Sequence, residues 1–176
     1  MVIEQESVSQ QEILKSRAIV NSVNENHNEM VAQAPTTVIK FSLISKTYAF
    51  ETKYISEVLL IKNITPIPGT PPFVAGVINI RGRIVSAINL KSLLNMGERG
   101  LTDQNRLIVL SMQTVYFGVI CDAVLGVFTE DRALVKSPPS NLPKNYLNYI
   151  TGVLPDGTIL LNAQKILTSS EIIINK

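Results

Sequence analysis

The fold is decided by a fifteen-residue stretch, Gly76-Val77-Ile78-Asn79-Ile80-Arg81-Gly82-Arg83-Ile84-Val85-Ser86-Ala87-Ile88-Asn89-Leu90. Two runs rich in β-branched residues flank Arg81-Gly82, and glycine supplies the positive φ that a tight reversal requires. The stretch therefore predicts a β-hairpin of two strands, Val74–Arg81 and Arg83–Asn89. The pattern after the second strand predicts a short helix, Leu90–Leu94.

The second half of the chain repeats this order. Gly152-Val153-Leu154 leads through a turn at Asp156-Gly157 to Ile159-Leu160-Leu161, and a second short helix is predicted at Ala163–Leu167. Asn89 and Asn162 each stand where a strand gives way to a helix, and asparagine is a favoured N-cap residue.

The aromatic runs extend the repeat, because Tyr48-Ala49-Phe50 corresponds to Tyr116-Phe117-Gly118. We therefore predict a mainly β fold of two similar β-modules. A half of roughly 60 to 70 residues would bury too small a core by itself, so the two modules are expected to share one.

From Thr36 onward, short apolar runs alternate with turn residues, which is typical of a barrel or sandwich. The proline-dense segments Pro66–Pro72 and Pro138–Pro143 are predicted to be connections, because proline lacks the N–H donor. The remaining strands are predicted at Thr37–Ile44, Thr47–Glu51, Glu57–Lys62, Arg106–Met112, Val115–Asp122, Ala123–Thr129, Tyr149–Leu154 and Thr158–Leu161.

Two segments differ in composition. Residues 1–35 are polar, contain five acidic and two basic residues, and are predicted to be a flexible extension with at most a short helix. Residues 36–176, with fourteen basic and nine acidic residues, form the predicted domain. The domain lacks the basic stripe of a nucleic-acid surface, so no nucleic-acid partner is expected. No apolar run reaches the roughly 18 residues of a membrane span, and the chain is expected to be cytoplasmic, without direct membrane insertion.

The sequence offers few groups for catalysis. The single histidine, His27, lies in the extension, and Cys121 stands among aliphatic residues as an expected buried thiol. No phosphate-binding loop, nucleophile elbow or Cys/His metal cluster is present, so no cofactor, metal or catalytic residue is predicted. Most carboxylates, including Asp103, Glu130, Asp131 and Asp156, fall in polar stretches or turns, where solvated or turn-forming roles account for them. A paired-carboxylate glycosidase stays a formal alternative.

Two charged residues interrupt apolar strands. Glu57 precedes Val58-Leu59-Leu60-Ile61, and Arg81 follows Ile78-Asn79-Ile80. Because a charge that leaves water needs a partner, Glu57 and Arg81 are predicted to form an ion pair. The pair could fix loop geometry, contact a partner protein, or do both.

The deciding stretch resembles the CheW family, whose members have the pattern G-V-x-N-L-R-G-x-I-V-P-V-x-D-L. The resemblance covers about residues 37 to 168 and extends to Tyr48-Ala49-Phe50, Asp122-Ala123-Val124 and Tyr149-Ile150-Thr151-Gly152-Val153. It implies two SH3-like β-barrel subdomains packed around a shared hydrophobic core. It also implies a non-catalytic adaptor that binds the regulatory domain of a CheA-type histidine kinase and the cytoplasmic tip of a methyl-accepting chemoreceptor. By position, the implied receptor-binding groove consists of Ile55, Glu57, Gly76, Arg81, Gly118, Val124 and Val127.

The chain departs from the family pattern at three positions. Asn89 stands where the family usually has aspartate, and Asn162 is the corresponding position in the second half of the chain. Ser86 stands where proline is frequent in the family. The long extension favours a twitching-motility or phototaxis type, the PilI-like branch, over flagellar chemotaxis. The resemblance does not place the kinase-binding surface. The alternative is a small β-barrel enzyme or ligand-binding protein with a polar pocket.

Overall fold

The computed structural model describes residues 34–97, 100, 102, 104–139, 142 and 144–172. The predictions for His27, for Asp103 and for a short helix before residue 34 concern positions outside these residues. The domain boundary at residue 36 likewise stays a prediction.

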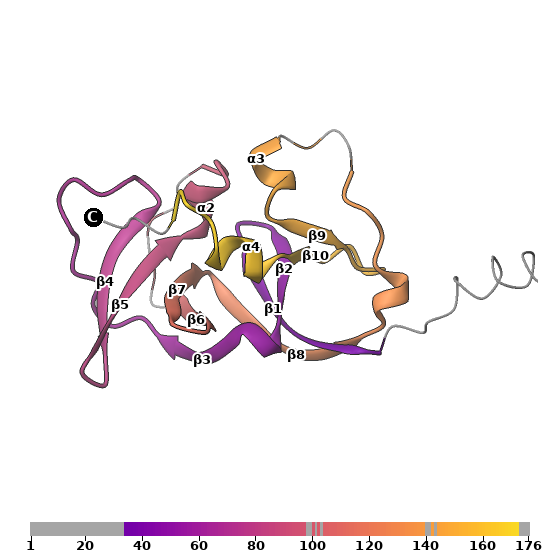
Figure 1. Ribbon diagram of the computed structural model, residues 1–176, viewed down its shortest axis with the longest axis horizontal. Coiled ribbons are helices and arrows are strands. Elements are labelled where there is room, and N and C mark those ends of the chain that lie inside the picture. The colour runs from indigo at the N-terminus through magenta and orange to yellow at the C-terminus, as the bar shows by residue number, and fades with distance from the viewer. Residues whose placement is uncertain are drawn as a thin grey trace, which may run out of the picture. The chain divides into compact units, whose positions relative to one another are not determined.

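Within the described residues, ten strands form two five-stranded sheets (Figure 1). Sheet A has the order β8 (Ala123–Glu130), β1 (Thr36–Leu43), β2 (Lys46–Glu51), β10 (Ile159–Leu161) and β9 (Ile150–Val153). Sheet B has the order β3 (Ile55–Leu60), β6 (Arg106–Met112), β7 (Val115–Cys121), β5 (Arg83–Asn89) and β4 (Val74–Ile80). The mainly β prediction is confirmed, and each predicted strand is present: β5 and β6 have the predicted bounds, and the ends of the others are shifted by one or two residues.

Short helices lie between strands or, in the case of α4, after the last strand. The two predicted helices are α2 (Leu90–Leu93) and α4 (Ala163–Leu167), and the Asn89 and Asn162 side chains accept N-cap hydrogen bonds from the first turns of these helices. Both cap predictions are confirmed. The sequence pattern did not predict α3 (Lys144–Leu147) or the two 3-10 turns, η1 (Thr52–Tyr54) and η2 (Arg132–Leu134).

The two sheets do not coincide with the two halves of the sequence. Sheet B consists of β3 to β7, whereas sheet A combines β1 and β2 with β8 to β10. Each sheet therefore takes its central hairpin from one repeat and its other strands from the other repeat. The predicted pair of modules is present, but its assignment to the first and second halves is wrong.

The strand register shows how closely the repeats correspond. The parallel pair Leu160↔Ala49 in sheet A is equivalent to the parallel pair Ala87↔Gly118 in sheet B. Because Ala49 corresponds to Gly118, the residue before each of them corresponds as well, so Tyr48 aligns with Phe117. The predicted match of Tyr48 with Tyr116 is thus off by one residue. Such a slip matters because neighbouring strand residues point to opposite faces.

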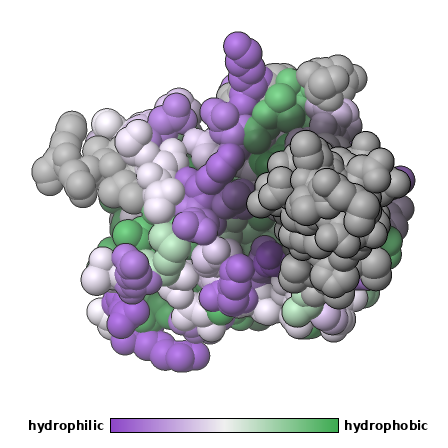
Figure 2. Space-filling view, turned by 45° about the vertical axis from the view of Figure 1, so that its right-hand side comes forward, coloured by the Kyte–Doolittle hydropathy of each residue, from purple (hydrophilic) through white to green (hydrophobic). Residues whose placement is uncertain are grey.

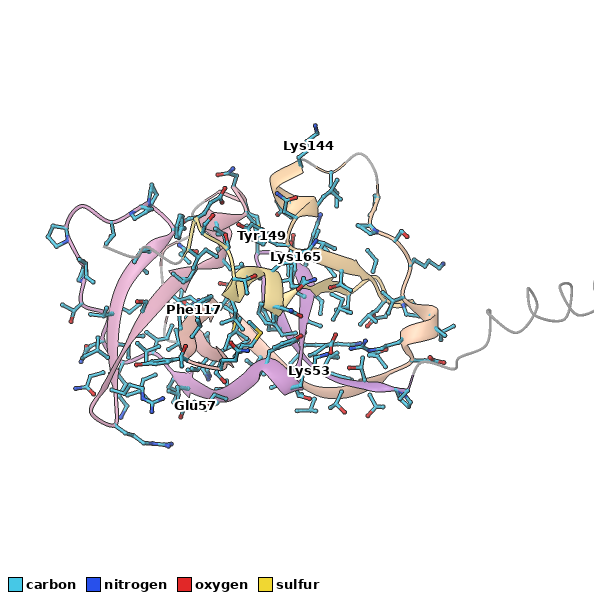
Figure 3. All side chains as sticks on the ribbon, viewed as in Figure 1. Lys53, Glu57, Phe117, Lys144, Tyr149 and Lys165 are labelled. Atoms are coloured by element: carbon cyan, nitrogen blue, oxygen red, sulfur yellow. The ribbon has the colours of Figure 1, made fainter. Side chains whose placement is uncertain are left out.

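A shared apolar core joins the sheets, as predicted. The main buried cluster draws on both sheets, with stacked aromatic rings of Phe41, Tyr48 and Phe50 from sheet A and Ile88, Ile108, Leu110 and Phe117 from sheet B. Phe117 is labelled near the centre of Figure 3. Two smaller clusters lie apart from the shared one, and the cluster in sheet B contains Ala87, Leu107, Val109 and Ile120. Burial of this apolar area is the main stabilising contribution to the fold.

Candidate interaction surface

Six of the seven predicted site residues lie on strands of the two sheets, and Arg81 lies in the turn between β4 and β5. Ile55 and Glu57 belong to β3, and Val124 and Val127 belong to β8. β3 is one of the two edge strands of sheet B, and β8 is one of the two edge strands of sheet A. Figure 1 shows β3 and β8 following one another along the lower side of the view. We call this region, with the Glu57–Arg81 pair, the β3–β8 surface.

The two edge strands are equivalent in the repeat. A β-bulge interrupts β3 between Ile55 and Glu57, and the matching bulge interrupts β8 between Val124 and Gly126. Ile55 and Val124 are half-buried against the shared core. The bulges bend both strands at the same point, so Ile55 and Val124 occupy equivalent positions on the β3–β8 surface.

The predicted pair of Glu57 and Arg81 is present. Arg81 Nη2 lies 3.4 Å from Glu57 Oε2, and the Arg81 side chain is 83% exposed while that of Glu57 is 28% exposed. Glu57 Oε2 is buried and accepts no hydrogen bond within the described part of the chain. The pair is therefore a long ion pair, which leaves the Arg81 guanidinium open to solvent.

A tight turn positions Arg81. Arg81 and Gly82 have φ values of 51° and 85°, as in a type I′ turn, and the Asn79 side chain accepts a 2.8 Å hydrogen bond from the Gly82 N–H. The hairpin predicted from Arg81-Gly82 is thus confirmed. Figure 3 labels Glu57 near the lower edge of the molecule, on β3.

The two glycines of the predicted set are buried. A Cβ on Gly76, whose φ is 142°, would lie 2.2 Å from the Thr65 carbonyl oxygen, and a Cβ on Gly118 would lie 2.5 Å from Leu107 Cγ. Both positions therefore need glycine to let neighbouring chain segments approach. In this structure they shape sheet B and offer no side chain to a partner.

Exposed apolar residues continue along β8. Val127 is 63% exposed, and Leu125 and Phe128 are also exposed. On the face shown in Figure 2, hydrophobic surface occurs as patches between hydrophilic side chains. An edge strand with exposed apolar side chains and an open backbone edge is suited to protein–protein contact.

A buried ion pair fixes the start of β8. Asp122 accepts hydrogen bonds from Lys91 Nζ, from the Ile44 N–H at 2.7 Å and from Asn105 Nδ2 at 3.2 Å. Burial alone would raise the pKa of Asp122, but the Lys91 ammonium and the Ile44 N–H outweigh it and lower the pKa below its ordinary value. Asp122 thereby ties the β1–β2 turn of sheet A to α2.

A second charged cluster lies in sheet A and was not predicted. Lys40, which is 7% exposed, pairs with Glu130 and Asp156, each at 2.7 Å, and its ammonium lies 4.6 Å from the Phe128 ring centroid. Burial would lower the pKa of Lys40, but the two carboxylates raise it above its ordinary value. The expectation of a solvated Glu130 is wrong, whereas Asp156 does form its turn by accepting hydrogen bonds from Thr158.

Sheet B is apolar at the position equivalent to Lys40. In the strand register, Lys40 lies opposite Ala49 on β2 and Gly126 on β8. At the equivalent point of sheet B, Val109 lies opposite Gly118 on β7 and Glu57 on β3. The alternating pattern of the strand indicates on which face of the sheet residue 40 lies, but it does not indicate whether a charge on that face is buried. The sequence therefore contains no sign that Lys40 is buried.

Other chemically active groups are few in the described part of the chain. Cys121 is buried, as predicted, and burial raises the pKa of its thiol to about 12. Among residues 34–172 that are described, no group of three or more His, Cys, Asp or Glu side chains could hold a metal ion. In the same residues, no helix is long and apolar enough to cross a membrane.

Comparison with known proteins gives a consistent result. A family model described as the CheW-like domain matches residues 37–171. The chemotaxis protein CheW of Bacillus subtilis is 29% identical over 125 residues, which cover 71% of this chain and 80% of that protein. The chemotaxis protein CheW of Treponema pallidum is 26% identical over 166 residues, covering 90% of this chain and 93% of that protein.

One further relative and one solved structure also match the chain. The protein PilI of Pseudomonas aeruginosa is 33% identical over 87 residues, covering 48% of this chain and 49% of that protein. The crystal structure of the scaffolding protein TtCheW from Thermoanaerobacter tengcongensis superimposes with a TM-score of 0.66 at 29% identity, covering 76% of this chain and 88% of that one.

Proposed function

The chain belongs to the family of CheW-like domain proteins, the scaffolds of chemotaxis-type signalling, and from that premise we propose that it couples a chemoreceptor to a histidine kinase. Its partners would be the cytoplasmic tip of a methyl-accepting chemoreceptor and the regulatory domain of a CheA-type kinase. The place of action would be the cytoplasm, at membrane-associated receptor arrays.

The observation that supports the receptor part of the proposal is the Glu57–Arg81 pair on the β3–β8 surface. Ile55 and Val124 present half-buried aliphatic side chains there, and Val127 presents an exposed one. An amphipathic receptor helix would place its apolar face on these residues. The exposed Arg81 guanidinium would make a polar contact that sets the register of the helix.

The proposed role is non-catalytic. The carboxylates Glu51, Asp122, Glu130 and Asp156 are engaged in ion pairs with lysine or arginine side chains. For Asp122 and Asp156, burial alone would raise the pKa, but the lysine partners outweigh it and lower the pKa below its ordinary value, which leaves these two groups poorly suited to proton transfer. The adaptor would instead influence the kinase through linkage, which requires that it bind the two signalling states of the receptor with different affinities.

The motility output is a separate proposal. We infer a chemosensory array, of the flagellar, twitching or phototaxis type, and the match with PilI, which covers 48% of the chain, supports the twitching branch. The match with the Treponema pallidum CheW covers 90% of the chain and so includes part of residues 1–33. A long N-terminal segment is therefore no distinguishing mark of the PilI-like branch.

The test of the receptor contact is a titration of the full chain with a receptor-tip fragment. Arg81→Ala should weaken binding about tenfold, in the range expected for a charge-assisted contact. Lys144→Ala is the matched control, because Lys144 on α3 lies at the opposite side of the molecule from Glu57 in Figure 3 and should leave the affinity unchanged. Equal affinity of Arg81→Ala and wild type would refute the surface assignment.

A further inference from the structure

The β4–β5 hairpin is longer than its counterpart in the repeat. The paired residues Val77 and Ser86 enclose eight residues. The equivalent pair, Val153 and Ile159, encloses only five. The equivalence is supported by the isolated bridges that Val77 and Val153 make with Thr65 and Lys136 respectively. The β4–β5 hairpin of sheet B is thus three residues longer than the equivalent β9–β10 hairpin of sheet A.

The additional length forms the tip that includes Arg81, Gly82 and Arg83. Figure 1 shows this tip projecting at the lower left, beyond the level of β3. Since the shorter β9–β10 hairpin completes sheet A without such a tip, the fold itself does not require two arginines there. A charged projection that the fold does not require points to recognition of a partner.

Both arginines are held in place. The turn fixes Arg81 beside Glu57, and the Arg83 guanidinium lies over the Tyr116 ring, 4.8 Å from its centroid. Stacking of a planar guanidinium on an aromatic ring restricts its motion while leaving its N–H donors free at the edges. Pre-organisation of this kind reduces the conformational entropy that the side chain loses on binding.

The charge at the tip is not balanced within the described residues. Glu57 is the carboxylate that lies within ion-pair distance of Arg81, and none lies within that distance of Arg83. The tip therefore carries a net positive charge with guanidinium donors directed to solvent. Carboxylates and phosphates both match the planar fork of arginine in charge and geometry, and of the two a protein helix carries the carboxylate as an ordinary side chain.

We propose that Arg83 is a second receptor-binding residue, which binds a carboxylate on the receptor helix beside the Glu57–Arg81 pair. The inference rests on the proposed receptor-binding function and adds the chemistry of the partner, an amphipathic helix with an acidic side chain on the flank that faces the β4–β5 tip. Tyr116 acts as a positioning residue, because it orients Arg83 without contacting the receptor.

The experiment is a calorimetric titration of the full chain with a receptor-tip fragment at low and high salt. Arg83→Gln should weaken binding about 3- to 10-fold at low salt and reduce the dependence of affinity on salt. Arg83→Lys keeps the charge but loses the planar guanidinium over the Tyr116 ring. The affinity of this variant should therefore lie between that of the wild-type chain and that of Arg83→Gln. Tyr116→Leu should match Arg83→Lys if the ring acts by orienting the guanidinium.

The controls separate the inference from the function on which it rests. Lys144→Gln removes one exposed charge on α3 and should change neither the affinity nor its salt dependence, and thermal unfolding checks that each variant is folded. If Arg83→Gln binds like wild type while Arg81→Ala binds more weakly, the inference on Arg83 is overturned and the proposed surface stands. If the wild-type chain does not bind the fragment, both are overturned.

Discussion

The substitution Asp122→Ala should destabilise the domain strongly, because it removes the acceptor of a buried charge. The Lys91 side chain is 5% exposed, and Asp122 is its carboxylate partner. Breaking a buried pair by removing one partner costs about 3 to 5 kcal/mol. Because the Asp122 side chain is 29% exposed, water can reach the vacated space, and we expect the lower end, about 3 kcal/mol.

Urea unfolding followed by circular dichroism measures this cost. With a slope of about 2 kcal/mol per molar urea, the midpoint should fall by about 1.5 M. Asp131→Ala is the control, since it removes another carboxylate that caps only the exposed turn η2, and it should cost about 1 kcal/mol or less.

A double substitution tests the cause. Adding Lys91→Met to Asp122→Ala removes the stranded ammonium, so the double variant should be more stable than Asp122→Ala alone, with a coupling free energy of about 1 to 3 kcal/mol. Purely additive effects, or a cost of Asp122→Ala below about 0.5 kcal/mol, would show that the buried Lys91 ammonium does not depend on Asp122.

Three further predictions concern stability and reactivity. Gly76→Ala should cost about 3 kcal/mol or more in urea unfolding, because its Cβ would overlap the Thr65 backbone, whereas Gly82→Ala, with open space around it, should cost about 1 kcal/mol. Because the pKa of Asp122 is lowered by folding, its contribution to stability is present above the unfolded pKa and is lost as pH falls through the folded pKa; Asp122→Asn should flatten the decline in unfolding midpoint below about pH 4. The Cys121 thiol should react with iodoacetamide only after unfolding, and fast alkylation of the native chain would contradict its burial.

Local sequence patterns predicted all ten strands of the described residues, since β-branched runs bounded by turn residues leave few alternatives. The Arg81-Gly82 turn and the Asn89 and Asn162 caps depend on contacts within a few residues, and the structure confirms them. The exchange of strands between repeats could not be predicted in this way, because it depends on which distant strands pair. The one-residue error in aligning Tyr116 has the same origin, since register is set by cross-strand partners.

For the candidate surface, sequence reasoning found the Glu57–Arg81 pair from two charges that interrupt apolar runs. It missed the contact of Arg83 with the Tyr116 ring, because that contact depends on the parallel pairing of β5 with β7. It also missed the buried Lys40 cluster, since its partners lie 90 and 116 positions away in the sequence. Contacts of this kind follow from topology, which local patterns do not specify.

The most direct test of the adaptor function is a binding titration of the full chain with the isolated regulatory domain of the CheA-type kinase from the same cell. We expect one-to-one binding with a Kd in the micromolar range or tighter, which corresponds to a binding free energy of about −8 kcal/mol or more negative. Absence of binding at concentrations of about a hundred micromolar, with both proteins folded, would contradict the coupling of receptor to kinase.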